Sequence, residues 1–272
     1  MKLYILPFDH RSSFIKLLNK PDKKKVQELK QIIFDGFLKV YNNYPKKKDL
    51  GILVDEKYGE EIIKFAKEKK ITFCLPIEKS GKKVLELEYK DLKKIKEINP
   101  DYIKILIRYN PLNIKTNKKQ LLTLKKVDAF CLKNEYKVIL ELLVPPTKKD
   151  LKLTKDYDRY LRLKRTIGAL KEIQENIKVN IWKLEGFNEK EWKEINKITK
   201  SKIIFLGRGE SKNKVIKWLL QAKKSKNIIG FAIGRTTFLE PITKYIEGSF
   251  SKEKTSLKIA NNFKYFIDLF NK

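Results

Sequence analysis

Histidine and cysteine are scarce in this chain of 272 residues, and their scarcity argues against several kinds of site. His10 is the only histidine, which leaves little room for a histidine-rich metal centre or for a Ser-His-Asp triad elsewhere in the chain. The only two cysteines, Cys74 and Cys131, lie in apolar surroundings and have neither metal-site spacing nor the number needed for a disulfide framework. Such thiols fit a reducing compartment, so we expect a cytoplasmic protein.

Long apolar runs are also missing. No stretch approaches the roughly 20 apolar residues that a membrane-spanning helix needs. The opening residues 1–8 are too short for the apolar region of a signal peptide, and they lead into charged residues instead of small ones. We therefore expect no membrane partner.

Arginine is rare beside lysine, which supplies 56 of the 63 basic residues and drives a formal net charge of +30. A charge of this size points first to nucleic acid or another polyanion. The lysines are spread over every helical segment without interleaved aromatic residues, so we interpret them as solvated faces and loops and expect no nucleic-acid partner. A polyanion-binding protein on a catalytically idle fold is the alternative from another functional class.

Eight strand-length apolar runs alternate with charged segments of helical periodicity. The runs cover residues 3–8, 50–54, 71–75, 103–107, 138–144, 179–184, 203–206 and 228–233. The helical segments include residues 24–41, 60–69, 119–126, 160–174, 189–198, 212–223 and 257–270. This alternation is typical of a parallel sheet covered by helices on both faces. The turn after the first run, residues 8–13, lacks the glycines of an open dinucleotide-binding sheet. We predict a (β/α)8 TIM barrel, as a single α/β domain over residues 1–272.

Lys183 stands out because it lies inside an apolar run, where an ammonium group is out of place. Charged residues are rarely fully buried without a partner, and burial favours the neutral, nucleophilic form of an amine. Glu141 also lies inside an apolar run, residues 138–144, and is therefore predicted to be buried. A structural ion pair of Lys183 with Glu141 or Glu185 is the alternative to a catalytic role.

The side-chain period of a strand indicates which charged residues share a face. Lys183 shares one with Glu185, Lys104 shares one with Arg108, and Asp9 shares one with Arg11. If these faces point inward, opposed charges meet at the mouth of the barrel. Lys104 can then support Lys183, or it emerges at the lower rim.

Four of the seven arginines lie just past an apolar run: Arg11, Arg108, Arg208 and Arg235. Because a guanidinium binds phosphate or carboxylate through a planar fork, these positions predict an anion site. Gly207, Gly209 and Gly234 flank two of these arginines, after the seventh and eighth runs, where barrels commonly bind phosphate. The other three arginines lie in residues 159–165, which we interpret as a solvated helix.

Eight ordered stretches combine these features across nearly the whole chain. They are residues 6–14 (LPFDHRSSF), 54–59 (VDEKYG), 76–81 (PIEKSG), 104–111 (KILIRYNP), 141–146 (ELLVPP), 182–186 (WKLEG), 206–209 (LGRG) and 230–236 (GFAIGRT). The ordered set resembles the class I aldolases typified by 2-deoxy-5-keto-D-gluconate 6-phosphate aldolase of myo-inositol breakdown. Relatives of that family include tagatose 1,6-bisphosphate and sulfofructose phosphate aldolases.

The resemblance implies a Schiff-base lysine on the sixth strand, which maps to Lys183. It also implies a supporting lysine, an acid/base carboxylate and an aspartate, which map to Lys104, Glu141 and Asp9. Arg208 and Arg235, with their glycines, fall where the family binds the substrate phosphate, and no metal or other cofactor is implied.

We therefore predict a metal-independent class I aldolase, a carbon-carbon lyase acting on a phosphorylated ketose or keto-acid. The first candidate substrate is 2-deoxy-5-keto-D-gluconate 6-phosphate, which would give dihydroxyacetone phosphate and malonate semialdehyde. Tagatose, fructose and sulfofructose phosphates are the alternatives. Arg11, Arg108 and Glu185 are further candidates for contacts with the substrate. A homo-oligomer is left open.

Overall fold

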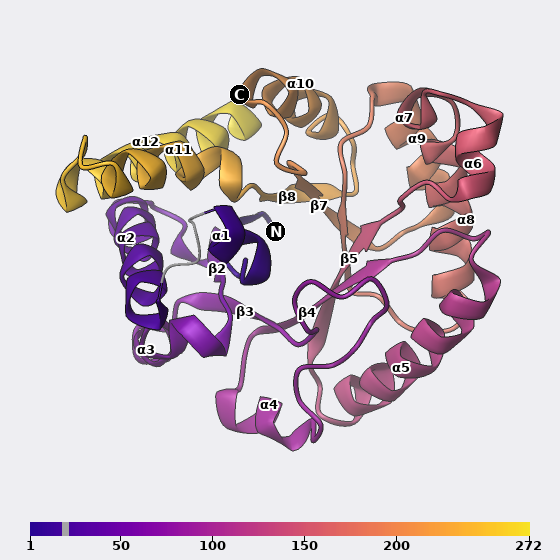
Figure 1. Cartoon of the computed structure of the whole chain (residues 1–272), viewed down its shortest axis with the longest axis horizontal. Helices are drawn as coiled ribbons and strands as arrows, with labels where there is room; N and C mark the ends of the chain where they lie inside the picture. Colours follow the sequence, from indigo (N-terminus) through magenta and orange to yellow (C-terminus); the bar gives the residue numbers. More distant parts are fainter. Residues whose placement is uncertain (18–21) are drawn as a thin grey trace.

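The computed structural model describes residues 1–17 and 22–272 and shows a closed barrel of eight parallel strands (Figure 1). Neighbouring strands pair in sequence order, and β8 returns to pair with β1. The strands are β1 (Leu3–Pro7), β2 (Leu50–Leu53), β3 (Thr72–Pro76), β4 (Tyr102–Arg108), β5 (Lys137–Leu143), β6 (Ile181–Leu184), β7 (Lys202–Leu206) and β8 (Ile228–Ala232). The predicted single-domain TIM barrel is confirmed.

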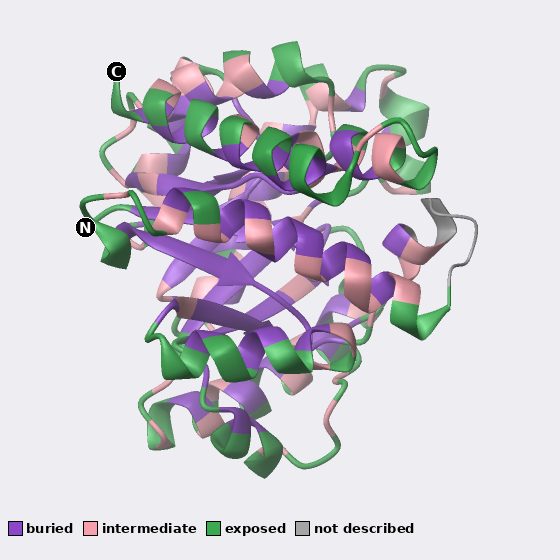
Figure 2. Cartoon of the chain, turned by 90° about the vertical axis from the view of Figure 1, so that its left-hand side faces the viewer, coloured by how far each residue is buried: buried purple, intermediate pink, exposed green. Residues whose placement is uncertain are grey.

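Helices surround the strands and turn their apolar faces toward them (Figures 1 and 2). They are α1 (Ser12–Leu17), α2 (Lys23–Tyr41), α3 (Glu56–Glu68), α4 (Lys93–Ile98), α5 (Ile114–Lys133), α6 (Lys148–Leu153), α7 (Tyr157–Tyr160), α8 (Arg162–Gln174), α9 (Glu189–Ile198), α10 (Lys212–Ala222), α11 (Arg235–Ile246) and α12 (Lys252–Asn271). Within the described residues, no helix is both long and apolar enough to span a membrane.

The sequence pattern located most of the longer helices and gave no segment for α1, α4, α6 and α11. The first three have six residues each, too few for a helical period to become visible. The fourth contains Pro241, and a proline within a sequence usually indicates the end of a helix. The segment predicted as one helix over residues 160–174 is divided between α7 and α8.

Two apolar layers make up the core. The larger one lies between the barrel and the helices, and the smaller one fills the barrel with inward-facing side chains such as Tyr102, Ile139 and Ile181. The barrel closes tightly where β8 meets β1, because a Cβ atom on Gly230 would lie 1.9 Å from the carbonyl oxygen of Leu3. Only a glycine allows the two backbones to approach this closely.

The interpretation of residues 159–165 as a solvated helix is wrong for two of the three arginines. Arg162 is buried, donates to the carbonyl oxygen of Gly186 at 2.8 Å and lies 4.3 Å from the centre of the Phe187 ring. Arg165 pairs with the buried Asp150 at 2.8 Å. Helical periodicity within α8 does not show that loops from other parts of the barrel pack over it.

Candidate active site

The charged residues predicted at the barrel mouth continue the inward-facing rows of the apolar core. The inward-facing core residues on β4, β5 and β6 are Tyr102, Ile139 and Ile181. On each of these strands, the residue two positions later points to the same side and is charged. These are Lys104, Glu141 and Lys183. The strand register places Glu141 directly beside Lys183. Apolar layers thus support a charged layer near the carboxyl ends of the strands, the usual catalytic face of this fold.

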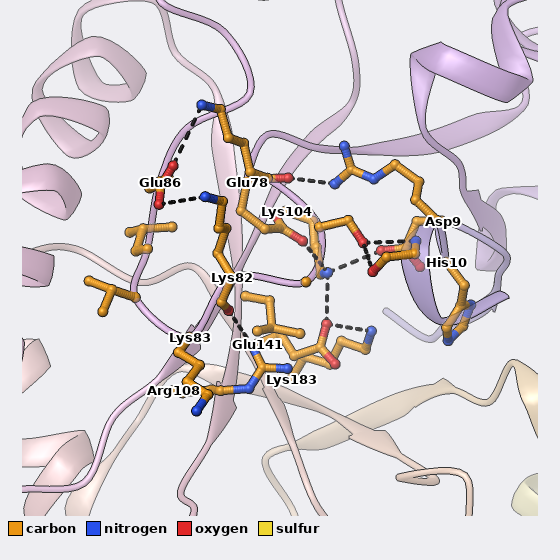
Figure 3. Close-up of a pocket in the computed structure, with 18 residues that line it drawn as sticks. Asp9, His10, Glu78, Lys82, Lys83, Glu86, Lys104, Arg108, Glu141 and Lys183 are labelled. Atoms are coloured by element: carbon orange, nitrogen blue, oxygen red, sulfur yellow. Dashed lines mark hydrogen bonds and ion pairs between the residues drawn. The ribbon is translucent and has the colours of Figure 1, made fainter. Parts of the chain in front are cut away.

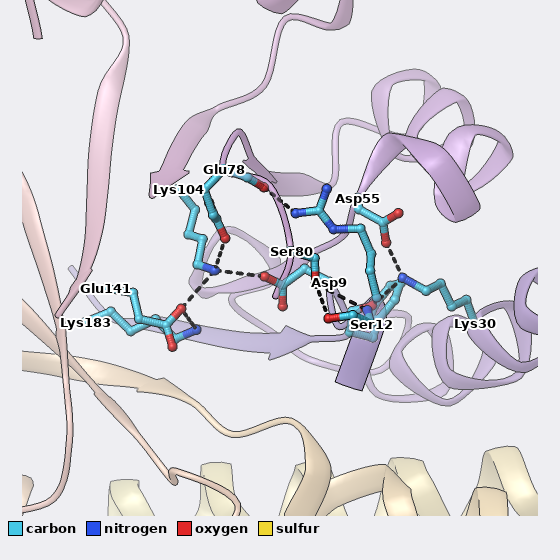
Figure 4. Close-up of polar contacts among 11 residues, drawn as sticks. Asp9, Ser12, Lys30, Asp55, Glu78, Ser80, Lys104, Glu141 and Lys183 are labelled. Atoms are coloured by element: carbon cyan, nitrogen blue, oxygen red, sulfur yellow. Dashed lines mark hydrogen bonds and ion pairs between the residues drawn. The ribbon is translucent and has the colours of Figure 1, made fainter. Parts of the chain in front are cut away.

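Four ion pairs join this layer into one cluster (Figure 4). Glu141 Oε2 lies 2.9 Å from Nζ of both Lys104 and Lys183. Lys104 Nζ also contacts Asp9 Oδ2 at 3.0 Å and Glu78 Oε1 at 2.7 Å. Lys104 is therefore enclosed by three carboxylates, whereas Lys183 pairs with one carboxylate, Glu141, within the described residues. The alternative that Lys104 emerges at the lower rim is wrong.

Charge coupling in this cluster outweighs the penalty of burial for three of its members. Burial lowers the pKa of Lys104, but Asp9, Glu141 and Glu78 raise it well above its ordinary value. Burial raises the pKa of Glu141, but Lys104 and Lys183 bring it down to about 2. The pKa of Asp9 is lowered for the same reason, chiefly by Lys104. At neutral pH, Lys104 is an ammonium, and Glu141 and Asp9 are carboxylates.

Glu78 differs from the other two acids, since burial raises its pKa by more than Lys104 lowers it. Its second oxygen, Oε2, is buried without a hydrogen-bond partner among residues 1–17 and 22–272. Sequence reasoning placed Glu78 after the third apolar run but gave it no role. It lies beyond the end of β3, where the two-residue period no longer shows which way a side chain points.

His10 is the second residue with an unpartnered buried atom in this region. Its Nδ1 has no hydrogen-bond partner within the described part of the chain. Burial lowers the pKa of His10 to about 4 against the opposing effect of Asp9, and Arg235 and Lys183 lower it further. The imidazole is therefore neutral at pH 7.

The cluster opens into a cavity with two lobes, which share His10, Leu106, Arg108, Glu141 and Lys183. The inner lobe lies under the loop between β3 and α4 and is lined by the acids around Lys104 (Figure 3). The outer lobe lies at the ends of β7 and β8, against Gly207, Arg208, Gly209, Gly234, Arg235 and Thr236. Lys183 therefore faces both lobes.

Glu185 pairs with Arg208 and does not converge with Lys183 at the barrel mouth. Glu185 follows the end of β6 and pairs with Arg208 Nε at 3.0 Å, while Arg208 Nη1 contacts Asp158 Oδ2 at 2.8 Å. Glu185 does not line either lobe within the described residues, so its predicted convergence with Lys183 is wrong. Arg208 borders the outer lobe, but two carboxylates hold its guanidinium.

Arg235 supplies a further guanidinium to the outer lobe, beside those of Arg208 and Arg108. Its Nη2 donates to the carbonyl oxygen of Arg208 at 2.9 Å. Gly209 has a φ of +78°, and a Cβ atom there would lie 2.4 Å from the Arg235 guanidinium. The glycine therefore provides both the left-handed turn and the space that Arg235 occupies.

The remaining two predicted arginines border the inner lobe. Arg11 is buried and pairs with Glu88 at 2.7 Å, and it also donates to the carbonyl oxygen of Glu78. It therefore holds the loop between β3 and α4 against the end of β1. Arg108 donates through Nη1 to the carbonyl oxygen of Lys82 at 3.0 Å.

A buried lysine that the sequence interpretation counted among solvated helix faces supports the first strand. Lys30 on α2 is fully buried, donates to the carbonyl oxygen of Phe8 at 2.8 Å and pairs with Asp55, which caps α3 (Figure 4). Burial lowers the pKa of Lys30 against the opposing effect of Asp55. This pair fixes the chain immediately before Asp9.

The comparisons with known proteins agree with the barrel fold. Residues 1–272 match the family model described as "Uncharacterized protein conserved in bacteria (DUF2090)". The chain belongs to this family. No curated protein matches the DUF2090 chain.

Similar solved structures include Cgl0159 from Corynebacterium glutamicum, with 12% identity, a TM-score of 0.63, and coverage of 96% of this chain and 86% of that one. An archaeal fructose 1,6-bisphosphate aldolase has 12% identity and a TM-score of 0.62, with coverage of 100% and 94%. A structure of such an archaeal aldolase with its catalytic Lys covalently bound to the carbinolamine intermediate has 12% identity and a TM-score of 0.61, with coverage of 98% and 94%. At these identities the likeness establishes the fold of the DUF2090 chain.

Proposed function

We propose that this DUF2090 protein is a class I aldolase, in which Lys183 forms a Schiff base with a phosphorylated ketose or keto-acid. The observation that carries the proposal is the position of Lys183. Its amine faces a cavity with an arginine-lined end, and it shares Glu141 with a permanently charged second lysine. The likeness to archaeal aldolases, one with a lysine bound to its substrate, supports this function.

Bond formation at Lys183 requires the amine to lose a proton, and Glu141 Oε2 is the carboxylate oxygen at hydrogen-bond distance. The freed electron pair attacks the ketone carbon, whose oxygen takes up protons and leaves as water. Lys104 stays charged through these steps because three carboxylates stabilise its ammonium.

The protonated imine then serves as an electron sink. The bond between the α and β carbons breaks, its electrons move toward the imine, and the β-hydroxyl gives its proton to a carboxylate as the aldehyde leaves. Asp9 and Glu141 are ionised and can accept that proton. Acid-base catalysis of this kind contributes roughly 10²- to 10⁴-fold. The resulting enamine takes up a proton at its α carbon, and water releases the ketone product from Lys183.

The outer lobe suits the phosphate of such a substrate. Arg235 lies at the amino end of α11, where backbone N–H groups and the helix dipole favour an anion. Phosphate held there would fix the register of the ketone against Lys183. The first candidate substrate is 2-deoxy-5-keto-D-gluconate 6-phosphate, giving dihydroxyacetone phosphate and malonate semialdehyde. Tagatose, fructose and sulfofructose phosphates are the other candidates.

Burial of the cluster favours the aldolase over a polyanion-binding protein on an idle barrel. Two ammonium groups and three carboxylates lie in the mouth, each at most 11% exposed in its side chain. Burying charges carries a desolvation penalty that even good pairing only partly offsets. A barrel without chemistry would gain as much from apolar residues there.

The test is release of dihydroxyacetone phosphate from a panel of the four sugar phosphates. Lys183→Arg keeps the positive charge but removes the nucleophilic amine, so turnover should fall at least about 10³-fold. Lys193→Arg, at an exposed position on α9, is the matched control and should retain full activity. Cleavage that survives in Lys183→Arg would overturn the proposal, as would the absence of cleavage with all four substrates.

A further inference from the structure

The inner lobe carries more positive charge than its reacting centre requires. Around Lys104 and Lys183, three carboxylates more than balance two ammonium groups. The rest of the lining reverses this sign, since five basic side chains accompany one acid, Glu86. The five are Arg11, Lys79, Lys82, Lys83 and Arg108. The surplus therefore lies on the loop between β3 and α4 and at the end of β4.

Three of these five cations already have carboxylate partners. Arg11 pairs with Glu88 at 2.7 Å. Lys82 and Lys79 share Glu86, at 3.1 Å and 3.5 Å.

Lys83 and Arg108 are left without a carboxylate partner across residues 1–17 and 22–272. Arg108 uses one nitrogen, Nη1, to donate to the carbonyl oxygen of Lys82. Lys83 and Arg108 both line the inner lobe, at its end away from Asp9 and His10 (Figure 3). Like charges gathered in a cavity wall produce a local potential that attracts an anion.

The position of Lys83 and Arg108 relative to the outer lobe indicates which part of a ligand they would contact. Going round the closed barrel, β5 and β6, which carry Glu141 and Lys183, lie between β4 and the phosphate-suited ends of β7 and β8. Arg108 borders both lobes, so the two basic ends belong to one continuous cavity. A ligand whose ketone meets Lys183 and whose phosphate lies in the outer lobe would direct its other end toward Lys83.

We propose that Lys83 and Arg108 form a second anion subsite, which selects substrates with an oxyanion at the end opposite the phosphate. The free guanidinium nitrogens of Arg108 can bind two oxygens of a carboxylate or phosphate, and Lys83 adds a compact charge. The subsite determines specificity and takes no part in bond cleavage. Its role in selecting substrates rests on the proposed aldolase function, but anion binding at the subsite can be measured without turnover.

Calorimetric titrations in the Lys183→Arg background separate binding from chemistry. One pair of probes is fructose 1,6-bisphosphate and fructose 1-phosphate. The other is 2-deoxy-5-keto-D-gluconate 6-phosphate and its uncharged C1 methyl ester. The two-ended member of at least one pair should bind about tenfold more tightly, the effect of one charge-assisted contact. The pair with the larger ratio identifies the terminal anion.

Adding Lys83→Gln, at a position that lines the inner lobe but not the outer one, should reduce the preference and leave the affinity for the one-ended probe unchanged, which also shows that the outer lobe is intact. Adding Arg108→Gln as well should abolish the preference, which is compared within each probe pair because Arg108 also borders the outer lobe. Lys90→Gln, an exposed position on the same loop outside the cavity, is the control and should retain the preference. A preference that persists in the double substitution would overturn the subsite, as would equal affinity within both probe pairs in the parent. Because no turnover is involved, these outcomes are independent of whether Lys183 forms an imine.

Discussion

Glu141 Oε2 lies 2.9 Å from Nζ of both Lys104 and Lys183, so one carboxylate oxygen joins two buried ammonium groups. The two lysines are not equivalent, because Lys104 has Asp9 and Glu78 as further partners. Lys104 is fixed as a cation, and Lys183 is the one that can exchange its proton with Glu141. This asymmetry distinguishes the supporting lysine from the proposed nucleophile.

Replacing Lys104 with methionine should destabilise the fold strongly. The substitution keeps most of the side-chain volume but leaves Asp9, Glu78 and Glu141 without the ammonium that they share. Removing one partner of a buried ion pair costs about 3 to 5 kcal/mol. Urea unfolding at pH 7 measures this loss. Lys94→Met on α4, whose side chain is 45% exposed, should change stability by no more than about 0.5 kcal/mol. Equal small effects of the two substitutions would contradict the assigned role of Lys104.

Mild acid should destabilise the protein through His10. Its pKa is about 4 in the fold and 6.5 as the ordinary value, so between these values the unfolded chain binds a proton that the folded chain excludes. This contribution is complete above pH 6.5 and is lost as the pH falls toward 4, by at most about 1.4 kcal/mol per pH unit. His10→Gln should flatten the stability curve in this window and leave it unchanged above it. Parallel curves for the two proteins would show that His10 is not the titrating group.

Acidification below pH 4.5 should remove a further contribution. The pKa of Glu141 is about 2 in the fold against an ordinary 4.5, because Lys104 and Lys183 outweigh its burial. Its contribution is present above pH 4.5 and is lost as the pH falls toward 2. Glu141→Gln should be less stable than the parent at pH 7, and the difference should shrink toward pH 2. A difference that is constant with pH would contradict the ionised state assigned to Glu141.

Releasing Arg208 should strengthen anion binding in the outer lobe. Asp158 and Glu185 both hold its guanidinium, and Asp158 is the more exposed of the two, at 41% of its side chain. Asp158→Asn weakens this hold, so the dissociation constant for inorganic phosphate should fall several-fold in a calorimetric titration. Glu240→Gln changes the net charge equally at an exposed site on α11. If both substitutions improve binding to the same extent, the effect is one of net charge and Asp158 does not compete for Arg208.

The sequence was sufficient for the strands and for the central pair of the site. Continuous apolar runs mark strands buried on both faces, and a lone charge within such a run, as at Lys183 or Glu141, must find a buried partner. The two-residue period then identifies residues that share a face. That inference fails at Glu185 because β6 ends at Leu184 and the next side chain no longer follows the pleat.

Contacts made by loops and between distant helices were beyond the reach of periodicity. Lys30 looks like any other lysine on a charged helix, and only the packing of α2 against β1 buries it. Glu78 and Arg162 are likewise defined by residues far away in the sequence, Lys104 and Gly186. Such contacts depend on how the loops fold over the barrel, and no local pattern encodes that.

The most direct test of the account is reductive trapping with borohydride in the presence of the ketose phosphate that the protein cleaves, followed by peptide mass mapping. Reduction of the imine should attach the ketone product or substrate irreversibly to one residue, Lys183, and should end turnover in proportion to labelling. Lys104, held as an ammonium by three carboxylates, should remain unlabelled. A label on any other lysine, or full turnover after borohydride treatment without a label, would contradict the assignment of Lys183 as the nucleophile.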